Sequence, residues 1–138
     1  MALVLDTGPI LAILDADDPA HARCVDLLEE FHEPLIVVAA TLVEIDYWIR
    51  KRLQPDVWSI FIEDIAEGAY RLEQLSVDDM RRMIALQAEY RDLDLGMVDT
   101  AVMVTCEKLG ERKVATLDRR HFGTVRPRHA DHFEILPR

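Results

Sequence analysis

The sequence predicts an α/β fold in which a short parallel sheet of about five strands is flanked by helices in a three-layer sandwich. Short apolar runs alternate with helical patterns along the chain, and these runs are apolar at nearly every position, as expected of strands buried on both faces. The 138 residues, half of them hydrophobic, suit one compact domain, and no internal repeat or long Gly/Ser/Pro linker divides them. We therefore expect a single domain over residues 1–138.

The first half of the chain is expected to contain two strands and four helices. A strand at residues 3–5 ends at the turn Asp6-Thr7-Gly8-Pro9, which also opens a helix with proline in its first turn. The β-branched run at 35–38 is too short for a helix and indicates a second buried strand. Helical spacing or proline punctuation predicts three further helices, at 19–31, 40–53 and 55–67.

The second half is expected to contain three strands and two helices. A short edge strand is expected at 70–72. Ser76 is a candidate N-cap for the following helix, with Asp79 three residues later. The pattern then predicts a helix over 97–109, followed by strands at 114–117 and 133–136.

The net charge of −10 argues at first against a nucleic-acid partner, because phosphate binding normally needs a basic surface. The charge is unevenly distributed, however. Residues 108–138 have eight Lys and Arg against four Asp and Glu, a net +4, whereas residues 1–107 have a net charge of −14. Such a polarised molecule can steer a polyanion to one face, but a solvated basic tail explains the composition equally well.

The cysteine usage favours a reducing compartment. Cys24 and Cys106 both fall in apolar helical patterns, which indicates free buried thiols rather than a disulfide scaffold. No apolar run approaches the roughly 20 residues that a membrane-spanning helix needs, and the first residues indicate a strand rather than a signal peptide. We expect a cytoplasmic protein without membrane contact.

Four carboxylates are expected at one edge of the sheet, where open α/β sheets bind ligands beyond the carboxyl ends of their strands. Asp6 directly follows the first strand, and Asp118 directly follows the fourth. Glu44 lies in the first turns of the helix after the second strand, and Asp99 lies in the first turn of the helix before the fourth. Both stand among apolar residues of their helices, which suggests that these two carboxylates are buried at a cost unless something compensates them. Clustered or buried carboxylates repel one another and lose hydration, and a bound divalent cation would compensate both costs.

The ligand types indicate which cation the site would hold. Oxygen ligands without a Cys/His cluster suit Mg²⁺ or Mn²⁺ better than Zn²⁺, and the five histidines show no HExxH spacing. Ions held in this way commonly serve phosphoryl chemistry. Each acid also has a structural explanation, as a helix cap, a dipole partner or an exposed helix residue. A metal site is nevertheless a better explanation than four unrelated structural roles, because one fold brings all four acids to the same edge.

Four segments around these acids resemble the PIN-domain family and, within it, the VapC-type toxins. They are Val4–Pro9, Ala40–Glu44, Leu95–Ala101 and Ala115–Phe122. Each segment alone is weakly specific, but the four occur in order and at family spacing over essentially the whole chain.

The resemblance implies a hydrolase with the PIN fold, an endoribonuclease that depends on Mg²⁺ or Mn²⁺. Asp6, Glu44 and Asp99 match the family's acidic triad, and Asp118 matches a fourth, less uniform acidic position, so all four are expected to be catalytic residues and metal ligands. The implied reaction is in-line hydrolysis by a metal-activated water, which leaves a 3′-hydroxyl and a 5′-phosphate. The implied biological role is the toxin of a VapBC-type toxin–antitoxin pair, which inhibits translation and growth. The implied partners are an RNA substrate, a small VapB-like antitoxin and a second copy of the chain.

Five neighbouring side chains are expected to support the acids. Thr7 and Thr116 match the family's hydroxyl positions, where they would orient a carboxylate or a metal-bound water. Arg119, Arg120 and His121 follow Asp118 and are candidates for holding the scissile or a flanking phosphate. A surface cluster at the start of a helix explains these three residues equally well.

Other classes fit less well. A haloacid-dehalogenase-type phosphatase needs a second Asp two positions after the first, where this chain has Gly8, and a receiver domain needs a lysine after a late strand, where Arg119 and Arg120 follow Asp118. Neither a GxGxxG motif nor a Walker P-loop is present. The alternative that stays open is a catalytically silent PIN fold that binds RNA or a protein partner. Such a fold would be expected to have lost one or more of the acids, and all four are present.

Overall fold

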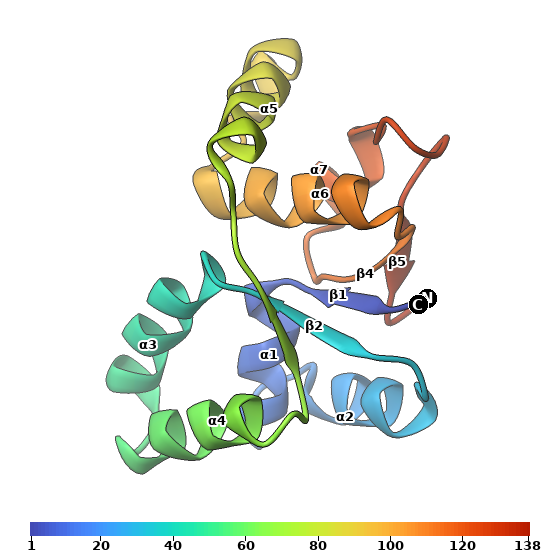
Figure 1. Ribbon diagram of the computed structural model, residues 1–138. Coiled ribbons are helices and arrows are strands. Elements are labelled where there is room, and N and C mark those ends of the chain that lie inside the picture. The colour runs from blue at the N-terminus through green and yellow to red at the C-terminus, as the bar shows by residue number, and fades with distance from the viewer.

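The computed structural model describes residues 1–138 and contains one five-stranded parallel sheet, covered by helices on both faces (Figure 1). The strands are β1 (Leu3–Leu5), β2 (Leu35–Val38), β3 (Arg71–Glu73), β4 (Lys113–Ala115) and β5 (Glu134–Leu136). The helices are α1 (Thr7–Leu14), α2 (His21–Glu30), α3 (Thr41–Arg52), α4 (Asp56–Ala66), α5 (Val77–Glu89), the 3-10 helix η1 (Arg91–Leu93), α6 (Met97–Leu109) and α7 (Arg119–Thr124). The α/β prediction is confirmed.

The strand order, β3-β2-β1-β4-β5, places the first strand at the centre of the sheet. The chain adds β2 and β3 on one side of β1 and later adds β4 and β5 on the other, so the order reverses between β1 and β4. Leu5 pairs with Val37 on one side and with Ala115 on the other. The carboxyl ends of β1 and β4 therefore lie side by side at the reversal, which is where sheets of this kind form a ligand-binding crevice.

Two hydrophobic layers sandwich the sheet, because successive side chains of a strand point to opposite faces. Leu3 and Leu5 pack with Ile45 and Phe61, in the layer formed by α1 to α4. Val4 packs in the opposite layer, formed by α5, α6 and α7 (Figure 1). Every residue of β1 is therefore buried, which explains why the sequence shows an uninterrupted apolar run rather than an alternating one.

Local signals place the ends of α5 and α6 where the sequence predicts them. The Ser76 hydroxyl accepts from the Asp79 N–H while the Asp79 carboxylate accepts from the Ser76 N–H, which is a capping box. Helix α6 begins after Gly96 and ends at Gly110, whose φ of 69° suits glycine. The predicted bounds of 97–109 match the observed helix.

One predicted strand is too long. The apolar run at 114–117 predicts a strand that ends immediately before Asp118, but β4 ends at Ala115. Leu117 has left the sheet and is 40% exposed. Thr116, not Asp118, is therefore the first residue after β4, in the position that Asp6 occupies after β1.

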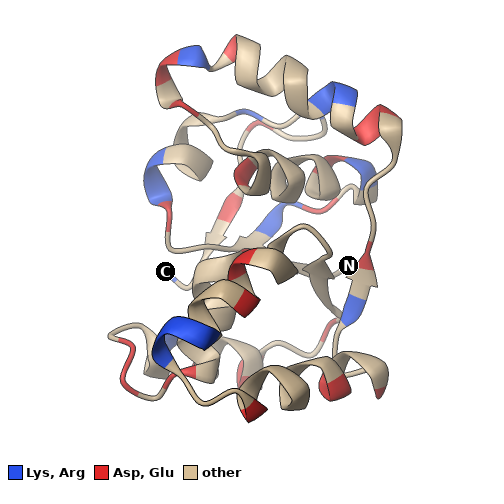
Figure 2. Ribbon diagram, turned by 90° about the vertical axis from the view of Figure 1, so that its left-hand side faces the viewer, with Lys and Arg blue, Asp and Glu red and all other residues tan.

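The basic C-terminal segment does not form a free basic face. Lys108 pairs with Asp79 at 3.0 Å, Lys113 lies 3.8 Å from Glu33, and the segment's cations are thus partly neutralised by acids. Figure 2 shows Lys and Arg on several separate elements instead of gathered on one. The expected charge polarisation exists along the sequence but is weakened in space.

Both cysteines are free and buried, as the sequence predicts. No helix combines the length and the apolar character that crossing a membrane would require.

Candidate metal centre

A cleft of about 650 Å³ opens at the carboxyl edge of the sheet, at the reversal between β1 and β4. All four predicted acids line it: Asp6 follows β1, Glu44 lies in the first turn of α3, Asp99 lies in the first turn of α6, and Asp118 precedes α7. The structure therefore brings together side chains from four separate segments of the chain. Met97 and Leu117 also line the cleft and are exposed, and nothing in the sequence pattern singled them out.

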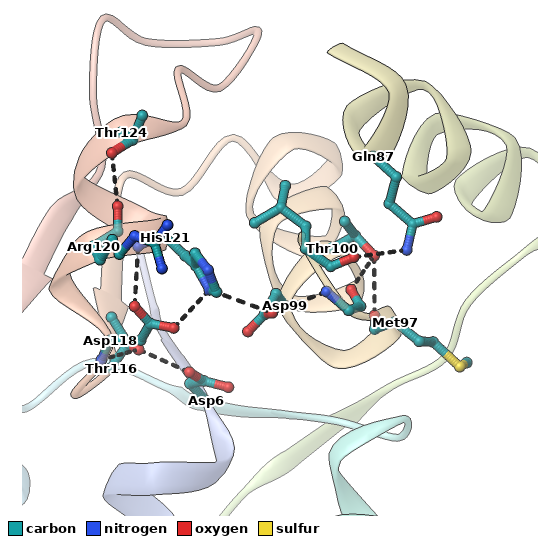
Figure 3. Close-up of polar contacts among 12 residues, drawn as sticks. Asp6, Gln87, Met97, Asp99, Thr100, Thr116, Asp118, Arg120, His121 and Thr124 are labelled. Carbon is teal, nitrogen blue, oxygen red and sulfur yellow. Dashed lines mark hydrogen bonds and ion pairs between the residues drawn. The ribbon is translucent and has the colours of Figure 1, made fainter. Parts of the chain in front are cut away.

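Asp6 is the buried member of the group, with 8% of its surface exposed. Its Oδ1 accepts from the Thr7 N–H at 2.8 Å, and its Oδ2 accepts from the Thr116 hydroxyl at 2.7 Å (Figure 3). Burial raises its pKa from 3.8 to about 6; the charges of Asp99 and Glu44 act in the same direction, and the two hydrogen bonds oppose the rise. Desolvation thus contributes more than the repulsion among the acids that the sequence suggested.

The two predicted hydroxyls connect pairs of acids. Thr7 donates from its backbone to Asp6 and from its hydroxyl to Glu44 Oε1, at 2.8 Å in both cases. Thr116 donates to Asp6 and accepts from the Asp118 N–H at 3.1 Å. Thr116 can do so because the register of β1 and β4 sets it directly beside Asp6. The two threonines thus connect Glu44, Asp6 and the backbone of Asp118 through hydrogen bonds, and Asp99 lies outside this chain.

Glu44 and Asp99 are less buried than the sequence suggested. Glu44 is exposed, and the Asp99 side chain is 23% exposed. Asp99 also has a local structural role, since its Oδ2 accepts from the Gly96 N–H at 3.1 Å at the start of α6. The interpretation that both acids are costly buried carboxylates is therefore wrong for Glu44 and only partly right for Asp99.

His121 lies inside the acidic group and not on the outer surface. Its Nδ1 is 2.7 Å from Asp118 Oδ2 and 3.6 Å from Asp99 Oδ2 (Figure 3). One ligand atom from each of Asp99, Asp118 and His121 lies within 4.8 Å of the others, a spacing at which one cation could contact all three. The sequence pattern predicts oxygen ligands alone, but on this side of the cleft a histidine nitrogen also lies within reach of a cation. His121 belongs to no spaced histidine pair, so its place beside the acids is decided only by the docking of α7.

The two arginines next to Asp118 differ from each other. The Arg119 guanidinium donates to the Pro137 carbonyl at 2.6 Å and so fastens α7 to the end of the chain. Arg120 is exposed, and its side chain forms neither a hydrogen bond nor an ion pair. Of the two, Arg120 is the side chain that stays available for a phosphate.

None of the four acids forms an ion pair with a lysine or arginine, and the basic side chain in contact with them is that of His121. Four carboxylates at one sheet edge need positive charge, and the protein provides little. The donor set therefore fits a divalent cation: several oxygens at different depths, with hydroxyls that fix two of the carboxylates. This fit is judged from the donor atoms of the side chains alone.

Comparison with known proteins places the chain in a family. Ribonuclease VapC26 of Mycobacterium tuberculosis is 28% identical over 135 residues, which span 98% of this chain and all of that protein. The crystal structure of Mycobacterium tuberculosis VapC20, described as a sarcin–ricin loop cleaving toxin, superposes with a TM-score of 0.79 at 14% identity over 86% of this chain and 92% of that one. A toxin–antitoxin complex from Klebsiella pneumoniae superposes with a TM-score of 0.70 at 16% identity, covering 89% and 92% of the two chains. The sequence profile of the PIN domain matches residues 3–126, which include all four acids, and the chain belongs to the PIN-domain family.

Proposed function

We propose that this protein is an Mg²⁺- or Mn²⁺-dependent endoribonuclease that hydrolyses RNA phosphodiester bonds as the toxin of a VapBC-type toxin–antitoxin pair. The observation that supports this most directly is the meeting of Asp6, Glu44, Asp99 and Asp118 in one cleft without a lysine or arginine partner. The full-length similarity to a protein named a ribonuclease supports the choice of RNA as the substrate.

Each part of the cleft has a distinct task in this proposal. Asp6, Glu44, Asp99 and Asp118 would hold the cation, which when bound lowers the pKa of an attacking water and neutralises charge on the leaving oxygen. Thr7 and Thr116 keep the carboxylates of Glu44 and Asp6 in place, so that little reorganisation is needed at the moment of reaction.

Binding the phosphate backbone of RNA needs basic side chains as well as the metal ion, and few basic side chains are available at the cleft. Arg120 is exposed and unpaired beside Asp118, so it is the residue proposed to bind the scissile or a flanking phosphate. Arg119 is assigned instead to the contact with Pro137 that it already makes. Exchanging Arg120 for Ala should weaken RNA binding, whereas Arg119→Ala should mainly lower stability.

The test is RNA cleavage by single acid variants. Asp6→Asn, Glu44→Gln and Asp99→Asn should each reduce cleavage by about a hundredfold or more, because each removes a charge from the metal site at nearly constant shape. Asp118→Asn should lose less. Circular dichroism would verify folding, and Asp92→Asn, an exposed acid outside the cleft, is the matched control.

If the protein is instead a catalytically silent PIN fold, the same assay should give the opposite result. A binding module would give no cleavage with Mg²⁺ or Mn²⁺, and EDTA would change nothing. Metal-dependent cleavage that survives in all four acid variants would instead point to a contaminating nuclease and would reject the proposal.

Two partners complete the proposal. A small VapB-like antitoxin would block the cleft, and a second copy of the chain would form a homodimer. Exposed apolar side chains such as Tyr47 on α3 and Ile84 on α5 are available for such contacts. Light scattering on the purified protein should give twice the chain mass of 15.9 kDa, and a mass of one chain would remove the dimer from the proposal.

A further inference from the structure

The ring of His121 occupies an unusual place for a residue of a surface helix. The helix α7 spans only Arg119–Thr124, yet the His121 side chain is only 17% exposed because its ring lies against Asp118 and Asp99, two residues that line the cleft (Figure 3). Its Nδ1 lies between the carboxylates of Asp118 and Asp99, at 2.7 and 3.6 Å. The ring thus faces two acids that come from different elements.

The Nδ1 atom is fully buried and makes no hydrogen bond of acceptable geometry, although an Asp118 oxygen is near enough for one. A buried polar atom without a partner costs free energy, so it is normally compensated by something in the working protein. A neutral imidazole nitrogen carries a lone pair that can bind a metal. A lone pair on Nδ1 would face carboxylate oxygens at 2.7 and 3.6 Å, an unfavourable contact between acceptors that a proton on Nδ1 or a cation bound among the three groups would relieve.

The spacing of the three groups suits a shared ion. Metal–ligand distances for oxygen and nitrogen are about 2.0–2.2 Å, so two ligands of one ion are at most about 4.4 Å apart. The Nδ1 contacts of 2.7 and 3.6 Å lie within this limit, and the 4.8 Å within which all three ligand atoms lie exceeds it only slightly. Small side-chain rotations would therefore suffice to bring the three groups around one cation.

We propose that His121 is a nitrogen ligand of the metal centre, on its Asp99–Asp118 side, and that it makes the site select Mn²⁺ over Mg²⁺. The inference rests on the proposed metal-dependent function and specifies its ligand set. Imidazole binds transition-metal ions well, whereas Mg²⁺ prefers oxygen and retains its waters. A nitrogen at this position therefore strengthens binding of Mn²⁺ and contributes little to binding of Mg²⁺.

A purely positioning role for His121 is less well supported. Asp118 is already fixed by other groups, because its Oδ1 accepts from the His121 backbone N–H at 3.0 Å and its own N–H donates to Thr116. The imidazole adds nothing that Asp118 needs for its orientation. The two roles nevertheless predict different results for His121→Asn, because an Asn amide can donate a hydrogen bond to Asp118 but is a poor substitute for an imidazole ligand.

Pulsed electron paramagnetic resonance on the Mn²⁺-loaded full chain tests the inference without measuring cleavage. The wild type should show ¹⁴N coupling from a bound imidazole, and His121→Asn should lose it. The exposed His132, exchanged for Asn, is the matched control and should retain the coupling. Titration of free Mn²⁺ should show about tenfold weaker binding by His121→Asn, and competition by Mg²⁺ should change less than threefold.

The outcomes separate this inference from the proposed function. Mn²⁺ that binds, is lost in Asp6→Asn, and shows no ¹⁴N coupling in the wild type would overturn the role of His121 and leave the metal-dependent nuclease intact. Equal losses of Mn²⁺ and Mg²⁺ affinity in His121→Asn would also overturn it. Absence of any Mn²⁺ binding by the wild type would overturn both. The wild-type spectrum decides the matter even if His121→Asn does not fold.

Discussion

Asp6 links the chemistry of the metal centre to the stability of the fold. Burial raises its pKa from 3.8 to about 6, so the native state holds the proton more tightly than the unfolded chain does. In the metal-free protein this stabilisation is fully present below about pH 4 and is lost as the pH rises through about 6. The difference between the two pKa values means that ionised Asp6 lowers the free energy of unfolding of the metal-free protein by about 3 kcal/mol at neutral pH.

Asp6→Asn should therefore melt at a higher temperature than the wild type in EDTA above pH 6, and the two proteins should converge near pH 4. At neutral pH, a hundredfold excess of Mn²⁺ over Kd should increase the free energy of unfolding of the wild type by about 2.7 kcal/mol and so raise its melting temperature. The effect should be smaller at acid pH. Mn²⁺ should do little for Asp6→Asn. Thermal melts with EDTA or Mn²⁺ at several pH values measure this, and an Asp6→Asn protein that is less stable than wild type in EDTA would contradict the argument.

Asp99 is a poorer residue for the same experiment. Its side chain is partly exposed, and its Oδ2 receives the Gly96 N–H at the start of α6. Asp99→Asn replaces a charged acceptor near a helix N-terminus and so sacrifices a favourable interaction. The greater burial of Asp6 therefore makes it the better residue for this test.

Thr116 is expected to matter through its hydroxyl alone. Thr116→Val keeps the shape but removes the donor to Asp6 and the acceptor for the Asp118 N–H, so cleavage should fall about tenfold or more as two acids lose their orientation. Thr116→Ser retains the hydroxyl and should keep most of the activity. Steady-state cleavage rates of the two variants give the comparison; equal rates would show that the hydroxyl is dispensable.

At the scale of a single element, the capping box of α5 gives a prediction independent of the site. Ser76→Ala removes the side-chain acceptor for the Asp79 N–H and should lower the free energy of unfolding by about 1 kcal/mol. Ser59→Ala, at an exposed position within α4, should change stability little, because it removes no cap. Urea denaturation of both variants tests the contrast, and equal losses would mean that the cap contributes nothing.

Elements with strong local signals could be predicted from the sequence, and those decided by tertiary contacts could not. Helix α6 matches its predicted bounds because Gly96 and Gly110 mark both ends. The end of β4 was misplaced because Leu117 continues the apolar run although it lines the cleft. Apolar character reveals that a residue avoids water or lies at a binding surface, but not which of the two applies.

The candidate site shows the same division. The four acids could be anticipated, because strand ends and helix starts fix where they lie in a parallel sheet. The inward turn of His121 could not, since it depends on how a six-residue helix docks against α6. The fastening of Arg119 to Pro137 likewise joins residues whose meeting is decided only by the pairing of β4 with β5.

For the whole molecule, the balance of charge predicts how an inhibitor would bind. The net charge is −10, the cleft is lined by four acids, and no lysine or arginine compensates them. An antitoxin segment that offers a basic side chain to this cleft would replace the cation electrostatically. Co-expression with the product of the neighbouring reading frame should give a stable complex, and exchanging the inserted basic residue for Ala should weaken binding at least tenfold and restore cleavage. Failure to form any complex would count against the antitoxin.

The central position of β1 also determines when the acidic cleft can form during synthesis of the chain. The hydroxyl of Thr116 reaches Asp6 across 110 residues of sequence, and one side of β1 has no partner until β4 pairs with it. While residues 113–118 are still inside the ribosome, the nascent chain therefore has an open sheet edge at β1. Asp6 and Asp118 then both lack their hydrogen bonds with Thr116. At 5 to 20 residues per second, translation would separate the appearance of β1 from that of β4 by about 5 to 20 seconds. If the chain acts as the proposed nuclease, its complete acidic cleft would therefore form only after nearly the whole chain has emerged from the ribosome.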